Sequence, residues 1–192
     1  MPMINYARRE INCKIVYYGP ALAGKTTNLR HLYSRVDPAT RGKMISLSTE
    51  ADRTLFFDFL PVDLGRIQGF KARFHLYAVP GQVHFSASPK LILQGVDGIV
   101  FVADSQRHRS AANIEAMHSL RESLESHVEK PSAIPLVLQY NKRDLEDVSS
   151  VPELRAQLNP DGVPELEAVA TKGSGVVDTF EAASELVVET LS

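Results

Sequence analysis

Apolar and polar positions follow distinct patterns along the chain, and each pattern predicts an element. Residues 70–78 alternate between apolar and polar side chains, which is typical of a strand with one buried face. Residues 96–103 are almost all apolar, as in a parallel strand that is buried on both faces. Residues 107–128 carry apolar side chains at helical spacing. The remaining patterns predict strands at residues 10–18, 55–62, 134–140 and 166–170, and helices at residues 26–36, 150–158 and 176–191.

The order of these elements predicts an α/β fold in three layers, with helices on both faces of a central sheet. The strands at 55–62 and 70–78 are joined by a short turn at residues 65–69, so they have to be antiparallel. We therefore expect a mostly parallel, six-stranded sheet with one antiparallel strand. The length of 192 residues favours a single domain over residues 1–192.

The loop between the first predicted strand and helix reads Gly-Pro-Ala-Leu-Ala-Gly-Lys-Thr at residues 19–26, a complete G-x-x-x-x-G-K-[ST] pattern. Between a strand and a helix, the backbone N–H groups of such a loop can surround anionic oxygens. Lys25 can reach the terminal phosphates of a nucleotide, and the Thr26 hydroxyl can bind Mg²⁺. The alternative, a glycine turn followed by a chance Lys-Thr, is disfavoured by this context. The expected nucleotide contacts here are Gly19, Ala21, Leu22, Ala23, Gly24, Lys25, Thr26 and Thr27.

A second motif indicates which base is bound. Residues 141–144 read Asn-Lys-Arg-Asp and follow the predicted strand at 134–140, and ligands of open α/β sheets bind at the carboxyl ends of strands. The Asp144 carboxylate can accept hydrogen bonds from N1–H and from the exocyclic amino group of guanine, whereas adenine offers no such pair of donors. Alone, the tetrapeptide fits a solvated polar turn. After a phosphate loop it favours guanine, with Asn141, Lys142 and Asp144 as contacts.

Several segments spread over nearly the whole chain are those of one protein family. They are residues 14–20, 46–50, 53–61, 74–77, 79–82, 98–105 and 141–145. With them the chain resembles the Ras-like small GTPases, and more closely their MglA-type bacterial branch, which acts in gliding motility and cell polarity. The most specific segments are Arg-Thr-Leu-Phe-Phe-Asp-Phe-Leu-Pro at 53–61 and Val-Pro-Gly-Gln at 79–82. The resemblance implies the small-GTPase form of the P-loop NTPase fold and a switch driven by GTP, GDP and Mg²⁺.

The resemblance implies catalytic roles for residues near the γ-phosphate of GTP. The Gly81 N–H would sense this phosphate, and the Gln82 side chain would orient the attacking water. Arg53 is similar to an arginine finger supplied in cis, which neutralises charge in the transition state. The catalytic set is then Gln82, Arg53 and Lys25. Without the phosphate loop, Gln82 would be an ordinary surface residue in a Pro-Gly turn. Without the family resemblance, Arg53 would be a solvated loop residue.

The resemblance also implies metal and base contacts. Thr54 would close over Mg²⁺ and the γ-phosphate, although Thr49 and Thr40 compete for this role. The metal ligands would then be Thr26 and Thr54. In small GTPases a backbone N–H after the last strand touches the guanine carbonyl oxygen. The residues that this implies are Val169, Ala170 and Thr171, with Ala170 at the aligned position.

Two departures from the family pattern concern catalysis more than binding. Ala78 stands where the family's D-x-x-G motif has an aspartate that holds a Mg²⁺-bound water, so the metal lacks one outer-shell anchor. Asp58 is a candidate substitute, with a solvent-facing side chain as the alternative. Ala21 stands where Ras-like proteins carry glycine, and its methyl group is expected to crowd the catalytic glutamine and arginine. Nucleotide binding is expected to survive both changes.

Composition narrows the classes of partner. The net charge is −2 and no basic run is present, which disfavours nucleic-acid or lipid binding. Cys13, the only cysteine, lies in the first predicted strand and is expected to be a small core residue. Neither a signal peptide nor a lipidation motif is visible. We expect a cytoplasmic monomer that partners recruit to the cell poles.

Two functions remain open at this stage. The first is a switch that hydrolyses GTP slowly without an activating protein, with an MglB-like, Roadblock-fold GTPase-activating protein and polarity or motility effectors as the partners that the resemblance implies. The second is a GTP-dependent scaffold with little or no turnover, which Ala21 and Ala78 favour and Arg53 and Gln82 disfavour. A P-loop kinase is disfavoured, because Asn141-Lys-Arg-Asp144 has no role there and no arginine-rich lid is apparent.

Overall fold

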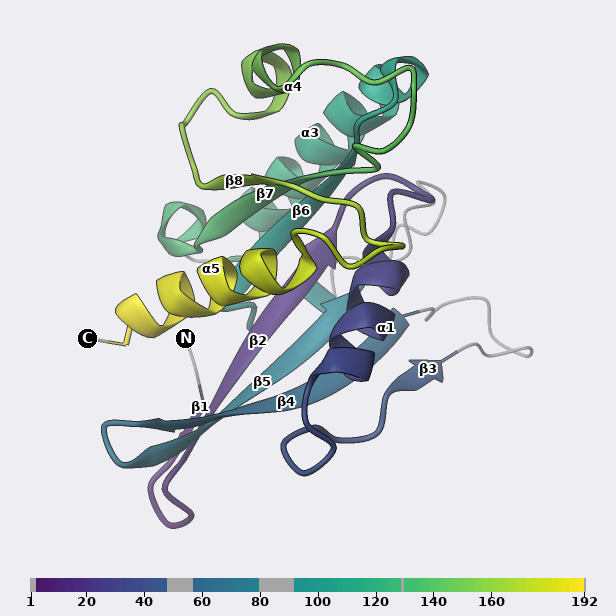
Figure 1. Cartoon of the computed structure of the whole chain (residues 1–192). Coiled ribbons are helices and arrows are strands. Elements are labelled where there is room, and N and C mark those ends of the chain that lie inside the picture. The colour runs from purple at the N-terminus through teal and green to yellow at the C-terminus, as the bar shows by residue number, and fades with distance from the viewer. Residues whose placement is uncertain (1–2, 48–56, 80–91, 129, 192) are drawn as a thin grey trace.

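A mixed β-sheet forms the centre of the molecule (Figure 1). The computed structural model describes residues 3–47, 57–79, 92–128 and 130–191. The described residues form an eight-stranded sheet in the order β3-β4-β5-β2-β6-β7-β8, with β1 paired to β2. Its strands are β1 (Met3–Asn5), β2 (Glu10–Tyr18), β3 (Ile45–Leu47), β4 (Phe57–Ile67), β5 (Phe70–Ala78), β6 (Gly98–Asp104), β7 (Leu136–Asn141) and β8 (Glu165–Glu167).

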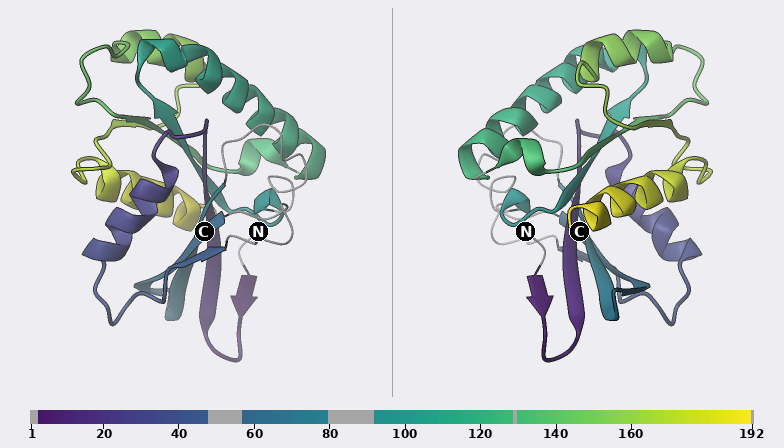
Figure 2. Two further views of the ribbon diagram at one scale, coloured as in Figure 1. Left: turned by 90° about the vertical axis from the view of Figure 1, so that its right-hand side faces the viewer. Right: turned by 90° about the vertical axis from the view of Figure 1, so that its left-hand side faces the viewer.

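Helices cover both faces of this sheet, so the predicted three layers are confirmed. Helices α1 (Lys25–Arg35) and α5 (Val176–Glu189) pack on one face. Helices α3 (Ser110–His127) and α4 (Val151–Leu158) pack on the other (Figure 2). Two short 3-10 helices, η1 (Arg107–Arg109) and η2 (Pro131–Ala133), precede α3 and β7. No helix in the described part of the chain is long and apolar enough to cross a membrane.

The predicted strand directions are confirmed. Strand β2 is parallel to β5 and β6, and β7 is parallel to β6 and β8. Strand β4 is antiparallel to β5. The expected number of six strands was too low, because β1 and β3 add short antiparallel pairs to β2 and β4. Each has only three residues, too few for a periodic pattern.

The turn expected at residues 65–69 is shorter than predicted. Strand β4 continues to Ile67, and its pairing with β5 shifts register between Asp63 and Arg66. Gly65 therefore lies within an irregular strand, with φ 90°, and the chain reverses at Gln68 and Gly69, where φ is 49° and 83°. An extra residue in one strand of an antiparallel pair produces such a shift. Gly69 was thus a correct signal for the turn, whereas Gly65 marks an unusual backbone within the strand.

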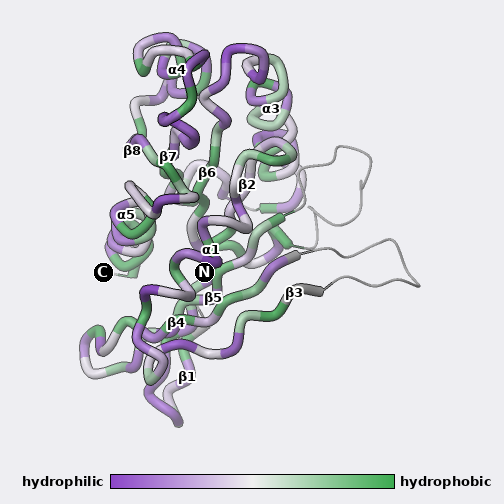
Figure 3. Tube along the Cα trace, turned by 45° about the vertical axis from the view of Figure 1, so that its right-hand side comes forward, coloured by the Kyte–Doolittle hydropathy of each residue, from purple (hydrophilic) through white to green (hydrophobic). Residues whose placement is uncertain are grey.

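The core follows the apolar pattern of the strands (Figure 3). All seven residues of β6 are buried, as its continuous apolar run predicts for a strand covered on both faces. In β2 alternate residues are buried up to Ile15, and both faces are buried from there on, where β6 joins its edge. Cys13 is fully buried, and burial, together with the nearby Asp97 carboxylate, raises the pKa of its thiol to about 12. The cysteine is a core residue, as expected.

Candidate functional site

The candidate site lies where the carboxyl ends of the parallel strands β2, β6 and β7 meet. The phosphate loop follows β2 and leads into α1. Its backbone takes left-handed conformations at Gly19, Leu22 and Gly24, where φ is 137°, 63° and 105°. A Cβ atom at Gly19 would lie 2.2 Å from the Val102 carbonyl oxygen, and one at Gly24 would lie 2.2 Å from Nδ2 of Asn141. Both positions therefore require glycine, and the loop can press closely against its neighbours.

The start of α1 suits an anion. Gly24 is the N-cap residue, no side chain caps the helix, and its first turn contains no acidic residue. The positive end of the helix dipole and its free N–H groups therefore remain available to a phosphate. A buried network holds the helix in place. Asn28 of α1 exchanges hydrogen bonds with Gln139 of β7, which also donates to Thr179 of α5.

Lys25 is buried beside the same loop. Its Nζ atom donates to the carbonyl oxygens of Gly19 and Pro20, at 2.9 and 2.6 Å. Burial, with a smaller contribution from the positive charge of Arg109, lowers the pKa of Lys25 to about 7. Phosphate oxygens at this position would favour the charged form of the amine. A buried, poorly compensated cation among loop carbonyls is what a phosphate site requires, so the residues fit a nucleotide.

Asn141 connects the phosphate loop to both loops that were expected to read the base. Its Nδ2 donates to the Ala23 carbonyl at 2.7 Å, and its Oδ1 accepts the Ala170 N–H at 2.9 Å. The Ala170 N–H is thus already engaged, and a guanine carbonyl would have to share it. Val169 makes a β-bridge to Ser174, which together with the bond to Asn141 fixes the turn that contains Thr171.

The other residues that were predicted to read the base surround this link. Asp144 forms an ion pair with Lys172 at 3.4 Å and keeps 28% of its side chain exposed, so its carboxylate is accessible to a base edge. Lys142 has a left-handed backbone and points its Nζ to Asp104 at 2.7 Å. Arg143, which was not expected to contribute, ties the loop to Glu167 and to the Ser149 carbonyl.

Thr26, the expected metal ligand, contacts a carboxylate. Its hydroxyl donates to Oδ2 of Asp58 on β4. Asp58 lies directly opposite Ala78 in the antiparallel ladder between β4 and β5, and opposite residues of such a pair project from the same face. The carboxylate missing at position 78 is thus present one strand away. Asp58 does not simply face solvent, and hydroxyl and carboxylate oxygens are a donor set that suits Mg²⁺.

Four predicted residues, Arg53, Thr54, Gly81 and Gln82, lie outside the described residues, as does the competing candidate Thr49. The other competitor, Thr40, is described. Its carbonyl accepts the N–H of Asp63 at 2.7 Å, five positions along β4 from Asp58. Thr40 is therefore held beside the middle of this strand, five residues from the position that contacts Thr26, which disfavours it as a ligand of the same metal ion.

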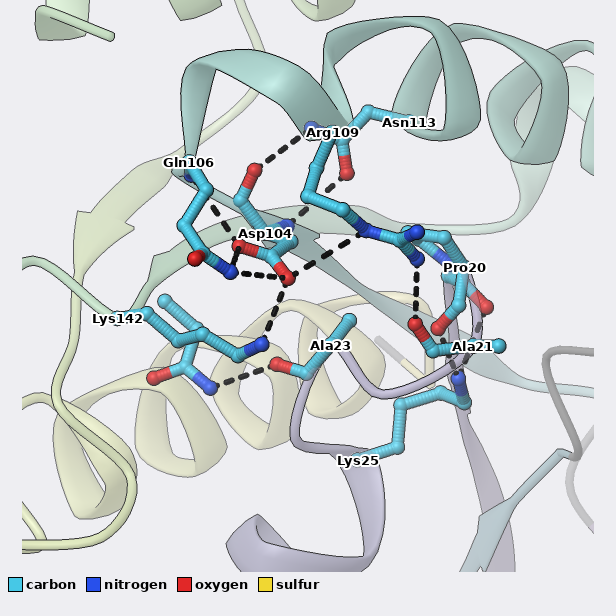
Figure 4. Close-up of polar contacts among 11 residues, drawn as sticks. Pro20, Ala21, Ala23, Lys25, Asp104, Gln106, Arg109, Asn113 and Lys142 are labelled. Carbon is cyan, nitrogen blue, oxygen red and sulfur yellow. Dashed lines mark hydrogen bonds and ion pairs between the residues drawn. The ribbon is translucent and has the colours of Figure 1, made fainter. Parts of the chain in front are cut away.

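Sequence reasoning missed a polar cluster behind the phosphate loop, centred on Asp104 (Figure 4). Asp104 is 1% exposed, and its carboxylate accepts from Lys142 and Gln106. Arg109 lies 3.7 Å from Asp104 and donates to the Ala21 carbonyl at 2.7 Å. Asp104 could have been suspected, because it ends a buried strand at the same edge of the sheet as Asn141. Arg109 had no comparable signal, since no motif surrounds it.

Comparison with known proteins decides the family. A sequence model of the Ras family matches residues 42–189. The chain belongs to the Ras family. The "Mutual gliding-motility protein MglA" of Myxococcus xanthus (strain DK1622) is 59% identical to it over 191 residues, which cover 100% of this chain and 98% of that protein. The chain is therefore a Ras-family GTPase and a homologue of MglA, as its motifs predicted.

The two comparisons cover different parts of the site. The Ras-family match begins after the phosphate loop, so the loop is placed in the family by the full-length likeness to MglA. Within this GTPase the loop geometry supports the same assignment independently, because Gly19 and Gly24 are both positions where no side chain fits.

Proposed function

We propose that this GTPase is a guanine-nucleotide switch that hydrolyses GTP to GDP and controls cell polarity or gliding motility through effectors. The observation that carries the proposal is Asn141, whose side chain bonds both the phosphate loop and the turn at Ala170. One residue thereby sets the distance between the phosphate nest and the base-reading loops. The name of the Myxococcus relative supports the cellular process.

The proposed nucleotide contacts are those expected from the motifs. The phosphates would lie against the loop and the start of α1, with Lys25 at the terminal phosphates. The base would lie between Lys142 and the turn at 169–171, with its N1–H and amino group toward Asp144. We propose that residues 1–192 form one domain. We also propose that the protein acts in the cytoplasm as a monomer, and that partners recruit it to the cell poles.

Guanine specificity is tested with Asp144→Asn. An amide at this position no longer accepts two hydrogen bonds, but it can donate to the second carbonyl of xanthine. The GDP dissociation constant should rise by roughly tenfold or more, and xanthosine diphosphate should gain affinity. Competition against a fluorescent guanine nucleotide measures both. Asp147→Asn, which alters an exposed carboxylate of the same loop, is the control and should change neither. Equal affinity of the wild type for ATP and GTP would contradict the proposal.

We further propose that Mg²⁺ binds to Thr26 and, in the GTP state, to Thr54, with Asp58 replacing the aspartate that is missing at position 78. The Thr26–Asp58 contact supports this arrangement. Magnesium at this place would neutralise charge on the β- and γ-phosphates. The protein has to hold the Thr26 hydroxyl in position, and Asp58 does so by accepting a hydrogen bond from it.

For catalysis we propose that Gln82 orients water and that Arg53 stabilises transition-state charge in cis, with a Roadblock-fold protein as activating partner. Arg53→Ala and Gln82→Leu should leave GDP affinity within a few-fold. With the activating protein present, Arg53→Ala should slow single-turnover hydrolysis, with a loss that approaches roughly 10³-fold. The loss is measured with GTP bound before the partner is added. An unchanged stimulated rate in Arg53→Ala would show that Arg53 is only a loop residue.

The scaffold remains the second candidate function, because the methyl group of Ala21 sits in the loop itself. The same experiment separates the two. A wild-type protein that binds GTP but shows no hydrolysis above the uncatalysed rate, even with the partner present, is a scaffold rather than a switch that turns itself off.

A further inference from the structure

Arg109, in the turn η1 just before α3, reaches the phosphate loop from outside every recognised motif (Figure 4). Its Nη2 donates to the Ala21 carbonyl oxygen at 2.7 Å, and its Nε lies 3.7 Å from the buried Asp104 carboxylate. The Arg109 side chain is only 27% exposed. A charge-assisted bond of this kind, backed by a buried carboxylate, is among the stronger hydrogen bonds in proteins.

The bond to the Ala21 carbonyl also orients the next residue. In a planar trans peptide the C=O and the following N–H point in opposite directions. With the Ala21 carbonyl held toward Arg109, the N–H of Leu22 has to point away from Arg109. Asn141 acts in the same way on the Ala23 carbonyl. The N–H of Gly24 therefore has to point away from Asn141. Two alternate N–H groups of the loop are thus aimed by side chains that lie behind it.

The Leu22 N–H belongs to the stretch of loop that follows Gly19 and Pro20. The carbonyl oxygens of these two residues accept hydrogen bonds from Lys25, the residue that we propose at the terminal phosphates. Within the described residues the Leu22 N–H donates to no other group, and its side chain is 85% exposed. The residue therefore contributes its backbone, rather than its side chain, to the site.

We propose that Arg109 is a positioning residue for the nucleotide, which aims the Leu22 N–H at the phosphates beyond the α-phosphate. The inference rests on the proposed function as a guanine-nucleotide switch. Asp104 connects Arg109 to a second loop, because its carboxylate also accepts a hydrogen bond from Lys142 at 2.7 Å. One buried carboxylate thereby joins the base-reading Lys142 to the Arg109 that orients the phosphate loop.

The test compares a guanosine diphosphate with a monophosphate in the full chain. In Arg109→Ala the GDP dissociation constant should rise by roughly tenfold, whereas that of GMP should change by less than about twofold. Arg109→Lys keeps the charge but not the two-sided reach of a guanidinium, and it should give a smaller loss in the same direction. Competition against a fluorescent GDP analogue measures all dissociation constants, and thermal unfolding is followed in parallel.

Arg107→Ala is the matched control. Arg107 lies in the same turn and pairs with Asp147 and Glu153, but it does not contact the phosphate loop, so both nucleotides should bind as in the wild type. Equal losses of GDP and GMP in Arg109→Ala would overturn the proposal and assign Arg109 a general structural role, as would unchanged GDP binding. If Arg109→Ala does not fold, Arg109→Lys decides the matter by the same comparison. A wild type without affinity for GDP would instead refute the proposed function.

Discussion

At the scale of single residues, one carboxylate has a position that motif analysis does not supply. The usual motif predicts an aspartate at the end of β5, where Ala78 stands, but the carboxylate that meets Thr26 comes from Asp58 on β4. The ladder makes the exchange possible, because positions 58 and 78 are direct neighbours that project from the same face. Spacing along the sequence could not show this, since twenty residues separate the two positions.

This arrangement predicts a rescue across the ladder. Asp58→Ala should raise the Mg²⁺ concentration that is needed to retain GDP by roughly tenfold, as the loss of an outer-shell partner does. The double variant Asp58→Ala/Ala78→Asp should recover part of the loss, because the carboxylate returns on the neighbouring strand. Release of fluorescent GDP, followed while Mg²⁺ is varied, measures the effect.

Asp63→Ala is the control for the rescue. Asp63 lies on the same strand, but it pairs with Lys71 and Arg73 and should leave Mg²⁺ dependence unchanged. If the Mg²⁺ dependence of Asp58→Ala is unaltered, the contact between Asp58 and Thr26 does not contribute to metal binding.

At the scale of elements, the start of α4 is held by hydrogen bonds from side chains of its own first turn. Ser150 and Glu153 form a reciprocal capping box, as the spacing Ser-x-x-Glu predicted. Glu153 also pairs with Arg107 of η1 at 3.1 Å. Bonds from the backbone and hydroxyl of Ser150, with a smaller contribution from Arg107, lower the pKa of Glu153 to about 2. The cap therefore keeps its negative charge at any ordinary pH.

Ser150→Ala should accordingly destabilise the protein by about 1 kcal/mol, the usual effect of losing an N-cap side chain. Urea unfolding followed by circular dichroism measures the difference. Ser126→Ala serves as comparison, because Ser126 lies within α3 and donates only to the carbonyl of Glu122 one turn earlier. It should be neutral or slightly stabilising, since alanine is the better helix former. A Ser150→Ala protein as stable as the wild type would mean that the box is not formed in solution.

Elements with a long, regular pattern were predictable, and those that depend on pairing were not. The strand at 70–78 has its predicted bounds, because nine alternating positions are compatible with only one assignment of the strand. The extension of β4 through Gly65 depends on a register shift that only its partner strand defines. The same division holds for the site. The phosphate loop and Asn141 follow from local spacing, whereas Asp58 and Arg109 reach it through strand register and the approach of separate loops.

At the scale of the whole molecule, the titratable side chain of His75 on β5 contacts both neighbouring strands. The ring of His75 on β5 stacks on Phe59 of β4, with centroids 5.7 Å apart. It also lies 3.0 Å from the side-chain oxygen of Asn12 on β2. Burial, aided by the positive charge of Arg73, lowers the pKa of His75 from its usual 6.5. The folded protein therefore takes up this proton at a lower pH than the unfolded chain does.

The free energy of unfolding should consequently fall as the pH drops below about 6.5, because the unfolded state then binds more protons. The loss should level off once the pH is below the folded-state pKa of His75. His75→Gln, which keeps an amide near Asn12, should remove this part of the pH dependence while lowering stability at pH 7.5. Urea titrations between pH 5 and 7.5 provide the measurement. A slope that persists in the variant would assign the effect to other groups.

The position of Asp58 opposite Ala78 has a consequence for how such sequences change over time. A chain could acquire a carboxylate at position 58 before it lost the one at position 78, so that no ancestor had to pass through a form without either. Two aspartates placed directly opposite would repel each other, and that repulsion would favour the loss of one. Among relatives, substitutions at the two positions should therefore be correlated, with a single acidic residue on either strand. A relative with alanine at position 78 would then have moved this carboxylate to the neighbouring strand rather than lost it.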